Sequence, residues 1–284
     1  MKKYFPVLLL ALLLPAPGPG REAYRLEKKD TITQVFKFSA AERARTVKID
    51  NVFGSITVSG TGTGEVRLEA RKLVRADSQD ALQKAERDVT LKMAEKDNQV
   101  EIYVDGPFRC REGSDRGFGH DYIVAYDFTV QVPERTSLVL KTVNDGDILV
   151  TNVRGEFTVR NVNGHIELQG IAGPVSGKTV NGRIRAAFSE NPAAACSFTT
   201  VNGDLEARFP AGLAAEFQLK TLNGGIFSDF PVSYLPATPG TASREKGRYV
   251  YRSRSFQGVR VGQGGPEIRM ETLNGDIVIA GEKK

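Results

Sequence analysis

The sequence predicts an all-β protein, a β-solenoid similar to a single-stranded β-helix, with coils of about 20 residues and one short helix in its N-terminal half. Three observations predict this fold class. A short phrase with an Asn-Gly turn recurs along the C-terminal half, apolar residues alternate on both sides of it, and a second corner recurs between its copies.

The recurring phrase is Thr-Val-Asn-Gly or a close variant of it. Its asparagines are separated by 19, 18, 21, 21 and then 51 residues, and self-similarity at such intervals indicates stacked coils or blades. The asparagines are Asn144, Asn163, Asn181, Asn202, Asn223 and Asn274.

Strands are expected on both sides of each asparagine. Phe198 and Thr200 precede Asn202, and Leu205 and Ala207 follow it, in the period-two alternation that is typical of half-buried strands. The residue directly before the asparagine breaks the alternation, so the chain must turn there. We expect Asn and Gly to supply the turn because both tolerate a positive φ.

The second corner follows each pair of strands. It occurs at 152–155 and again at 171–173, and each copy leads into a new apolar alternation. Two corners and two short strands per coil describe a small solenoid, whose coils must stack on one another to bury their apolar faces. The alternative is a meander in which every Asn-Gly is a hairpin turn, which accounts less well for the second corner.

Residues 1–20 have the pattern of a secretory signal peptide. Lys2 and Lys3 precede an apolar run of about ten residues, which is shorter than the roughly 20 needed to span a bilayer. We therefore expect an exported protein in the periplasm or at the cell surface, without a transmembrane segment after signal removal. Loss of the two lysines lowers the formal charge from +5 to +3, and this mild excess argues against a nucleic-acid partner.

The mature chain divides into three parts by pattern. They are a poorly ordered lead-in at 21–44, a β-rich part with a short helix at 45–135, and the solenoid repeats at 136–284 with an insertion at 228–265. The helix is expected within 76–89, where apolar residues fall at helical spacing after a capping Asp77 or Ser78.

Further elements follow from local patterns. We expect strands at 65–74, 100–104 and 122–133, a loop at 108–120 rich in Gly and charge, and an outlying hairpin at 249–261.

The strand Glu-Val-Arg-Leu-Glu-Ala-Arg at 65–71, Tyr-Asp-Phe-Thr-Val-Gln-Val-Pro at 126–133 and the iterated Val-Asn-Gly-Asp units together carry a resemblance. The chain resembles the bacterial putative adhesin family of domains of unknown function, also described as Toastrack-like β-solenoid domains, over about residues 45 to 281. The resemblance implies an exported or envelope-facing β-helical module with no established chemistry and no catalytic residues. The chain departs from the family by its Pro-rich insertion and by the lack of a recognisable transmembrane segment.

The six asparagines are the first candidate site. We expect them to stack as an internal amide ladder, in which each side chain bonds to the next coil. The alternative is an external polar row that binds a glycan.

Metal sites are not expected. Asp145, Asp147, Asp204 and Asp276 lie beside the turns, but Leu149 and Val150 occupy places where an EF-hand needs a ligand and a glycine. Neither His120 nor His165 has a second ligand at zinc spacing. No cofactor motif is present.

A carbohydrate-active enzyme is the main alternative class. Outward carboxylates on neighbouring coils could act as acid and base, and Asp147, Glu167, Asp204 and Glu206 are the candidates. Carboxylates on strands usually only solvate a face, so we predict no enzymatic activity and no catalytic residues.

The insertion is the second candidate site, because aromatic and arginine side chains on protruding loops are typical of interface anchors. The alternative is that they cap an open end of the solenoid. The residues are Phe227, Phe230, Tyr234, Tyr249, Tyr251, Arg252, Arg254 and Phe256.

The sequence thus predicts a non-enzymatic, exported cell-envelope protein, an adhesin or interaction scaffold whose partner is an envelope protein or a glycan. A purely structural envelope protein is the third class. Cys110 and Cys196 are the two cysteines, and export would permit them to pair.

Overall fold

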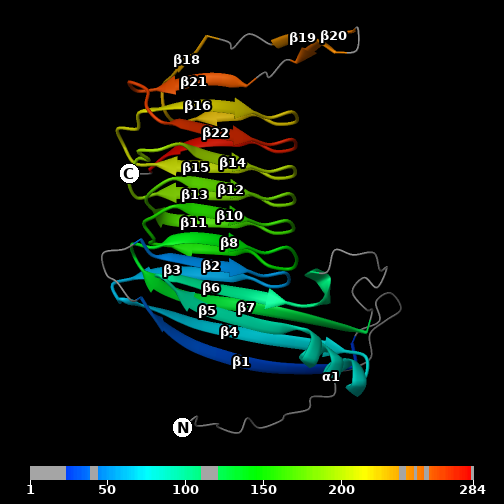
Figure 1. Cartoon of the computed structure of the whole chain (residues 1–284). Coiled ribbons are helices and arrows are strands. Elements are labelled where there is room, and N and C mark those ends of the chain that lie inside the picture. Colours follow the sequence, from blue (N-terminus) through cyan, green and yellow to red (C-terminus); the bar gives the residue numbers. More distant parts are fainter. Residues whose placement is uncertain are drawn as a thin grey trace.

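The repeats form a β-solenoid of two facing sheets, which continues into an antiparallel N-terminal end (Figure 1). This computed structural model describes residues 24–38, 44–109, 121–236, 241–245, 248–252 and 256–282. The predicted fold class is confirmed, because strands dominate the described residues and the repeats pair in parallel.

The two sheets are named sheet I and sheet II. Sheet I contains, in spatial order, β1 (Leu26–Lys37), β4 (Glu65–Ala76), β7 (Tyr122–Pro133), β3 (Ile56–Thr61), β9 (Ile148–Thr151), β11 (Ile166–Ile171), β13 (Ile184–Phe188), β15 (Leu205–Phe209), β23 (Ile277–Gly281) and β17 (Ile226–Ser228). Sheet II contains β18 (Val232–Tyr234), β21 (Gln257–Val261), β16 (Ala215–Lys220), β22 (Glu267–Glu271), β14 (Cys196–Thr199), β12 (Val175–Lys178), β10 (Phe157–Arg160), β8 (Ser137–Lys141), β2 (Thr46–Asp50), β6 (Gln99–Asp105) and β5 (Thr90–Lys96). Outside both sheets lie the pair β19 (Thr241–Glu245) and β20 (Arg248–Arg252), the helix α1 (Gln79–Asp88) and the 3-10 turn η1 (Pro107–Arg109).

Each coil contributes one strand to each sheet. The chain passes from β8 in sheet II through the Asn-Gly turn to β9 in sheet I, and returns through the second corner to β10 in sheet II. The alternative meander is therefore wrong, because the two strands that flank an Asn-Gly turn belong to different sheets and do not pair with each other.

The core lies between the sheets, because the period-two alternation of most strands turns one face of each inward. Among its largest fully buried side chains are Phe157, Phe198, Phe209 and Phe217. The rings of Phe209 and Phe217 meet edge to face with their centroids 5.9 Å apart. Stacked coils thus bury apolar side chains that a single coil would leave exposed to solvent.

The coils do not stack in the order in which the chain visits them. After β14 and β15, the chain continues into β16 and β17, and only then returns to form β22 and β23. The returning coil pairs on one side with β14 and β15 and on the other with β16 and β17. Figure 1 shows β22, coloured near the red end of the scale, between β14 and β16. The C-terminal coil is therefore intercalated into the stack.

The N-terminal segment departs from the expected poorly ordered lead-in at 21–44. β1 pairs with β4 over 12 residues, from Leu26 opposite Ala76 to Lys37 opposite Glu65. The alternation was hidden in the sequence because two of its partly buried positions are the charged Lys28 and Asp30. Lys28 forms an ion pair with Glu86 of α1.

The predicted helix is confirmed but shorter. Ser78 caps α1, accepting a hydrogen bond from the Ala81 amide at 3.1 Å. Ala81, Leu82 and Ala85 form its buried face. No helix within the described residues is long and apolar enough to cross a membrane.

The expected outlying hairpin at 249–261 is wrong. β21 pairs antiparallel with β16 and β18 in sheet II, whereas β20 pairs with β19. Val259 and Val261 account for this placement, because both are buried against the core as parts of sheet II.

Candidate interaction surfaces

The six repeat asparagines form one continuous chain of hydrogen bonds along the outside of the stack. Asn144 starts the chain, and each of the other five side-chain amides donates to the side-chain oxygen of the asparagine before it in the stack at 2.7–2.8 Å. Because the C-terminal coil is intercalated, Asn274 lies between Asn202 and Asn223. The expected coil-to-coil bonding is present, but the expected interior location is wrong, since Asn144 is half-buried and the other five are exposed.

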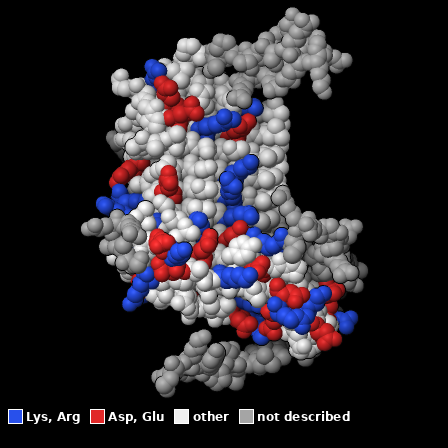
Figure 2. Space-filling view, in the orientation of Figure 1, with Lys and Arg blue, Asp and Glu red and all other residues white. Residues whose placement is uncertain are grey.

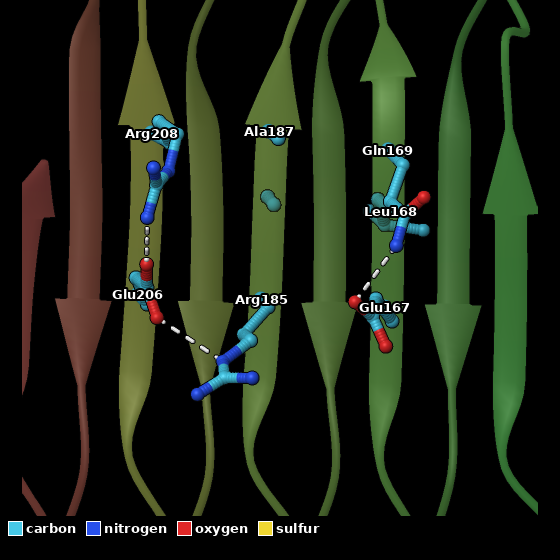
Figure 3. A pocket seen from close by; sticks show the side chains of 8 residues that line it. Glu167, Leu168, Gln169, Arg185, Ala187, Glu206 and Arg208 are labelled. Carbon is cyan, nitrogen blue, oxygen red and sulfur yellow. Dashed lines mark hydrogen bonds and ion pairs between the residues drawn. The ribbon is translucent and has the colours of Figure 1, made fainter. Parts of the chain in front are cut away.

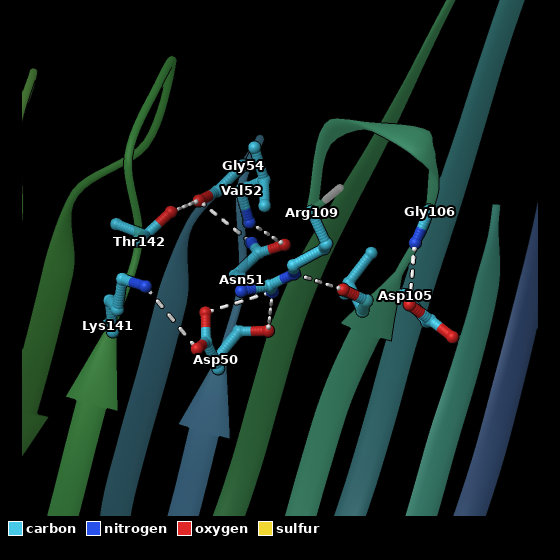
Figure 4. Close-up of polar contacts among 10 residues, drawn as sticks. Asp50, Asn51, Val52, Gly54, Asp105, Gly106, Arg109, Lys141 and Thr142 are labelled. Atoms are coloured by element: carbon cyan, nitrogen blue, oxygen red, sulfur yellow. Dashed lines mark hydrogen bonds and ion pairs between the residues drawn. The ribbon is translucent and has the colours of Figure 1, made fainter. Parts of the chain in front are cut away.

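The interior ladder consists of threonines instead. Thr200 Oγ1 donates to the carbonyl oxygen of Gly182 in the neighbouring coil at 2.9 Å. Equivalent bonds of 2.8–3.0 Å run from Thr142, Thr179, Thr221 and Thr272 to glycine carbonyls of their neighbouring coils. Figure 4 shows the first step, where Thr142 and Asn51 both donate to the carbonyl of Gly54. These hydroxyl groups donate hydrogen bonds to carbonyl groups of the turns, which take no part in the backbone hydrogen bonding of the two sheets.

Close packing of the coils, not a positive φ at asparagine, accounts for the glycines of the turns. None of the six asparagines has a positive φ, so that expectation is wrong. A Cβ atom on Gly182 would lie 2.1 Å from the carbonyl oxygen of Gly164, and one on Gly203 would lie 2.2 Å from that of Gly182. Only glycine lets the backbones of successive turns approach so closely.

The aspartates beside the turns bond to backbone amides. Asp147 accepts from the amide of His165 at 2.7 Å, Asp204 from that of Asp276 at 2.9 Å, and Asp276 from that of Gly225 at 2.7 Å. Asp145 occupies a left-handed turn position with φ 54°. The described residues contain no cluster of three His, Cys, Asp or Glu that could bind a metal, and His120 lies outside them.

A shallow depression of about 470 Å³ lies on the outer face of sheet I over β11, β13 and β15 (Figure 3). Arg185 and Arg208 both pair with the Glu206 carboxylate, at 3.1 and 2.8 Å. Glu167 accepts a hydrogen bond from Gln169 at 2.9 Å. The charges on this face therefore neutralise one another.

This arrangement does not suit acid–base catalysis by the candidate carboxylates. Glu206 and Glu167 are separated by β13, and the Arg185 side chain projects from that intervening strand (Figure 3). Both oxygens of the Glu206 carboxylate are occupied by arginines, so they do not face a substrate. Asp147 and Asp204 are bound to backbone amides at the turn.

The outer face of sheet II carries a second set of charges that pattern reading missed. Lys141, Arg160 and Lys178 lie in register on β8, β10 and β12, each three residues before its asparagine. We name these three residues the basic row. Figure 2 shows basic side chains over the middle coils of this face, with mixed charges above and below them. This set could have been found by aligning the repeats on their asparagines, since a basic residue then occupies the same position in three successive coils.

The basic row is bounded by charge clusters at both ends. At one end, Asp50 pairs with Arg109 at 3.0 Å and with Lys141 at 3.4 Å (Figure 4). The Arg109 guanidinium also stacks on the Tyr103 ring, 4.2 Å from its centroid. Arg109 therefore fastens the η1 turn to the end of β2 and holds Asp50 in place.

At the other end, Glu271 binds Lys220 at 3.0 Å and Arg269 at 2.8 Å. Burial raises the pKa of the Glu271 carboxyl, but the hydrogen bonds from Arg269 and Lys220 outweigh burial, so that the pKa is lowered overall. The ring of Phe256 lies against the Arg269 guanidinium, 4.1 Å from centroid to Cζ.

The structure does not gather the described aromatic residues of the insertion into one patch. Phe227 is 54% exposed on β17 in sheet I, and Tyr234 is 74% exposed on β18 in sheet II. Phe230 packs against the core and Phe256 covers Arg269. The side chains of Tyr249, Tyr251 and Arg252, and the whole of Arg254, lie outside the described part of the chain.

Cys196 lies buried in β14, and burial raises the pKa of its thiol. Cys110 lies outside the described residues.

Solved structures of several bacterial proteins resemble this chain at low sequence identity. No curated protein matches it. A putative cell adhesion protein from Clostridium sporogenes superposes with a TM-score of 0.43 and 10% identity, over 90% of this chain and 100% of the other. A putative lipid binding protein from Parabacteroides distasonis gives 0.35 and 10%, over 88% and 96%. A putative adhesin from Bacteroides fragilis gives 0.30 and 11%, over 89% and 97%.

The family comparison concerns the middle of the chain, from β7 to the first residues of β17. Residues 126–227 match the family model described as Toastrack DUF4097. The resemblance to Toastrack domains of unknown function is thereby confirmed over these residues.

Proposed function

We propose that this protein is a non-enzymatic, exported cell-envelope protein that acts as an adhesin or interaction scaffold. The observation that carries the proposal is the in-register repetition of outward-facing side chains on both sheets. Equivalent positions of successive coils recur at about 4.8 Å across a parallel sheet. An extended partner can therefore make many weak, equivalent contacts whose sum gives a useful affinity.

The pairing of the carboxylates supports a binding role over a catalytic one. Glu206 lies between two arginines, and Asp147 and Asp204 accept backbone amide hydrogens. A catalytic pair on a polysaccharide would need one carboxyl that keeps its proton and faces a substrate cleft. The depression over sheet I is shallow and its charges are neutralised by one another.

Export is proposed from the pattern of residues 1–20, which lie outside the described residues. Expression of the whole chain in a bacterium, followed by mass determination of the N-terminus in the periplasmic and culture fractions, tests it. We expect a shortened chain in one of these fractions. An intact chain confined to the cytoplasm would contradict the proposal.

The end of the stack near β17 and β18 is the proposed site for a protein partner. Phe227 and Tyr234 are large aromatic side chains exposed at this end, and such residues dominate the energetics of many interfaces. β21 and β18 extend sheet II beyond β16, which agrees with a capping role for part of the insertion. Tyr234 thus belongs to the capping strand β18, whereas Phe227 lies on β17 directly before the insertion.

The test is a binding screen of the mature chain against envelope glycans, peptidoglycan fragments and envelope protein extracts. Removal of 228–265 would destroy β21 and β18, so a smaller change is needed. The Leu235 amide bonds to the Gly258 carbonyl at 2.9 Å, so Asn-Gly in place of 237–255, with Phe256 as the third residue of the loop, should close β18 onto β21.

We expect the wild type to bind at least one of these classes. If the shortened chain melts like the wild type but loses a protein partner, residues 237–255 are the site for that partner and the assignment to Phe227 and Tyr234 is wrong. If neither chain binds any class, the interaction role is wrong and a structural role remains.

A further inference from the structure

The basic row consists of three basic residues at directly paired positions of three neighbouring strands. Lys141 is directly opposite Arg160 across the β8–β10 pair, and Arg160 is directly opposite Lys178 across the β10–β12 pair. Side chains at paired positions of neighbouring strands point to the same face of a sheet. The three cations therefore project side by side from sheet II.

The basic row carries positive charge that the protein itself leaves largely unneutralised. Lys141 has a carboxylate partner, Asp50, at 3.4 Å. Arg160 and Lys178 are exposed, and no carboxylate of the described residues lies within ion-pair distance of either. On sheet I, by contrast, both arginines of the depression have a carboxylate partner, Glu206. The exposed cations of sheet II are thus available to an external anion.

A column of small hydroxyl side chains runs beside the basic row. Two residues earlier on the strands, Thr158 of β10 is in register with Ser176 of β12, and Ser176 with Ser197 of β14. These short side chains keep this part of the face low. Hydroxyl groups both donate and accept hydrogen bonds, so they complement the hydroxyl groups of sugars.

Acidic residues limit the length of this surface. Asp50 bounds it at β2 and Glu271 at β22, and each carboxylate is already bound by basic residues of the protein. The strands β8, β10, β12 and β14 between them span about 14 Å. A ligand would run along the stack axis and contact the surface with a few consecutive units.

We propose that the outer face of sheet II over β8 to β14 binds a linear anionic glycan. Its carboxylate, sulfate or phosphate groups pair with the basic row, and its sugar hydroxyls bond to Thr158, Ser176 and Ser197. The inference rests on the proposed function and names the ligand class of one face of the scaffold.

The composition of the surface favours a glycan over other polyanions. Proteins bind single-stranded nucleic acids through aromatic side chains on which the bases stack. Neither the basic row nor the hydroxyl column of Thr158, Ser176 and Ser197 contains an aromatic residue. A membrane surface is usually recognised by clusters of about four to eight basic residues or by inserted apolar groups. Three cations beside a hydroxyl column fit neither pattern.

The experiment measures binding of the mature chain to three polymers with one backbone: dextran, carboxymethyl-dextran and dextran sulfate. The variant Arg160→Gln/Lys178→Gln removes both unpaired cations. The control variant Lys37→Gln/Lys84→Gln removes two exposed cations from β1 and α1, with the same change in net charge. Thermal unfolding of each variant verifies the fold.

We expect both anionic polymers to bind, neutral dextran to bind far more weakly, and binding to fall as salt is raised. Loss of the two cations should weaken binding about tenfold, since an exposed ion pair contributes up to about fivefold. The control should bind like the wild type. The relative affinities for carboxymethyl-dextran and dextran sulfate separate carboxylate from sulfate recognition.

Equal weakening in both variants would overturn the proposal in favour of nonspecific charge attraction. Tighter binding to single-stranded DNA or to phosphatidylglycerol vesicles, with the same dependence on Arg160 and Lys178, would overturn the glycan assignment. Binding of other envelope ligands without any response to the basic row would refute this inference alone. Failure of the wild type with every ligand would refute the proposed function as well.

Discussion

The interior threonine ladder makes a sharp prediction, because each hydroxyl is the donor to a turn carbonyl of the neighbouring coil. Thr200 is 3% exposed and donates to the Gly182 carbonyl at 2.9 Å. The substitution Thr200→Val keeps the shape of the side chain and removes the donor. The Gly182 carbonyl then stays buried without its side-chain hydrogen bond.

The expected cost is about 1–3 kcal/mol of unfolding free energy, the penalty for a buried polar group that loses its partner. The methyl group that replaces the hydroxyl recovers up to about 0.8 kcal/mol through burial. A net loss of about 1–2 kcal/mol should lower Tm by about 2–8 °C in a chain of this size.

The matched control is Thr199→Val, one residue earlier at the end of β14. The Thr199 side chain is on the outer face, half-buried, so the same substitution there should change stability by less than about 0.5 kcal/mol. Urea unfolding followed by circular dichroism measures both variants. Equal midpoints for Thr199→Val and Thr200→Val would refute the reasoning that the interior hydroxyls stabilise the coil-to-coil contact.

Three further predictions concern a turn and two titrating groups. Gly203→Ala should destabilise the stack by about 1–3 kcal/mol or more, because φ is 151° and the new Cβ would lie 2.2 Å from a backbone carbonyl oxygen. The control Gly62→Ala, with open space around it, should be neutral when both variants are compared by thermal unfolding. The pKa of Glu271 is lowered in the folded state, so its ion pairs stabilise the fold fully at pH values above its ordinary pKa of 4.5. The unfolding free energy of the wild type should therefore exceed that of Glu271→Gln at neutral pH, and the difference should shrink as the pH falls below 4.5. An advantage that persists at pH 2 would contradict it. Burial raises the pKa of Tyr126 to about 12 from an ordinary 10.0, so stability should fall between pH 10 and 12, and Tyr126→Phe should lose less stability over that interval in urea titrations.

The coil and its two corners could be predicted from the sequence because local rules specify them. The alternation around Asn202 defines two half-buried strands, and the break before the asparagine defines the turn. The start of α1 could be predicted to within one residue, at Asp77 or Ser78, because a capping side chain acts on an amide three residues away; Ser78 is the cap. These signals survive because each depends on neighbours in the chain.

The missed features depend on contacts between distant residues. The spacing of the repeats along the chain does not predict that Asn274 bonds to Asn202, because a coil with this pattern could pair with any other coil of the stack. The charged Lys28 hid the partly buried face of β1, since its partner Glu86 lies 58 residues away. The column of Lys141, Arg160 and Lys178 becomes a feature only when the coils are superposed in register.

The intercalated coil sets the order in which the molecule can be completed. A ribosome delivers β16 and β17 before β22 and β23, yet the later pair separates the earlier one from the rest of the stack. A nascent chain that closed β16 directly onto β14 would have to open again to admit the last coil. The complete stack therefore cannot close until β22 and β23 are inserted between strands that precede them in the chain.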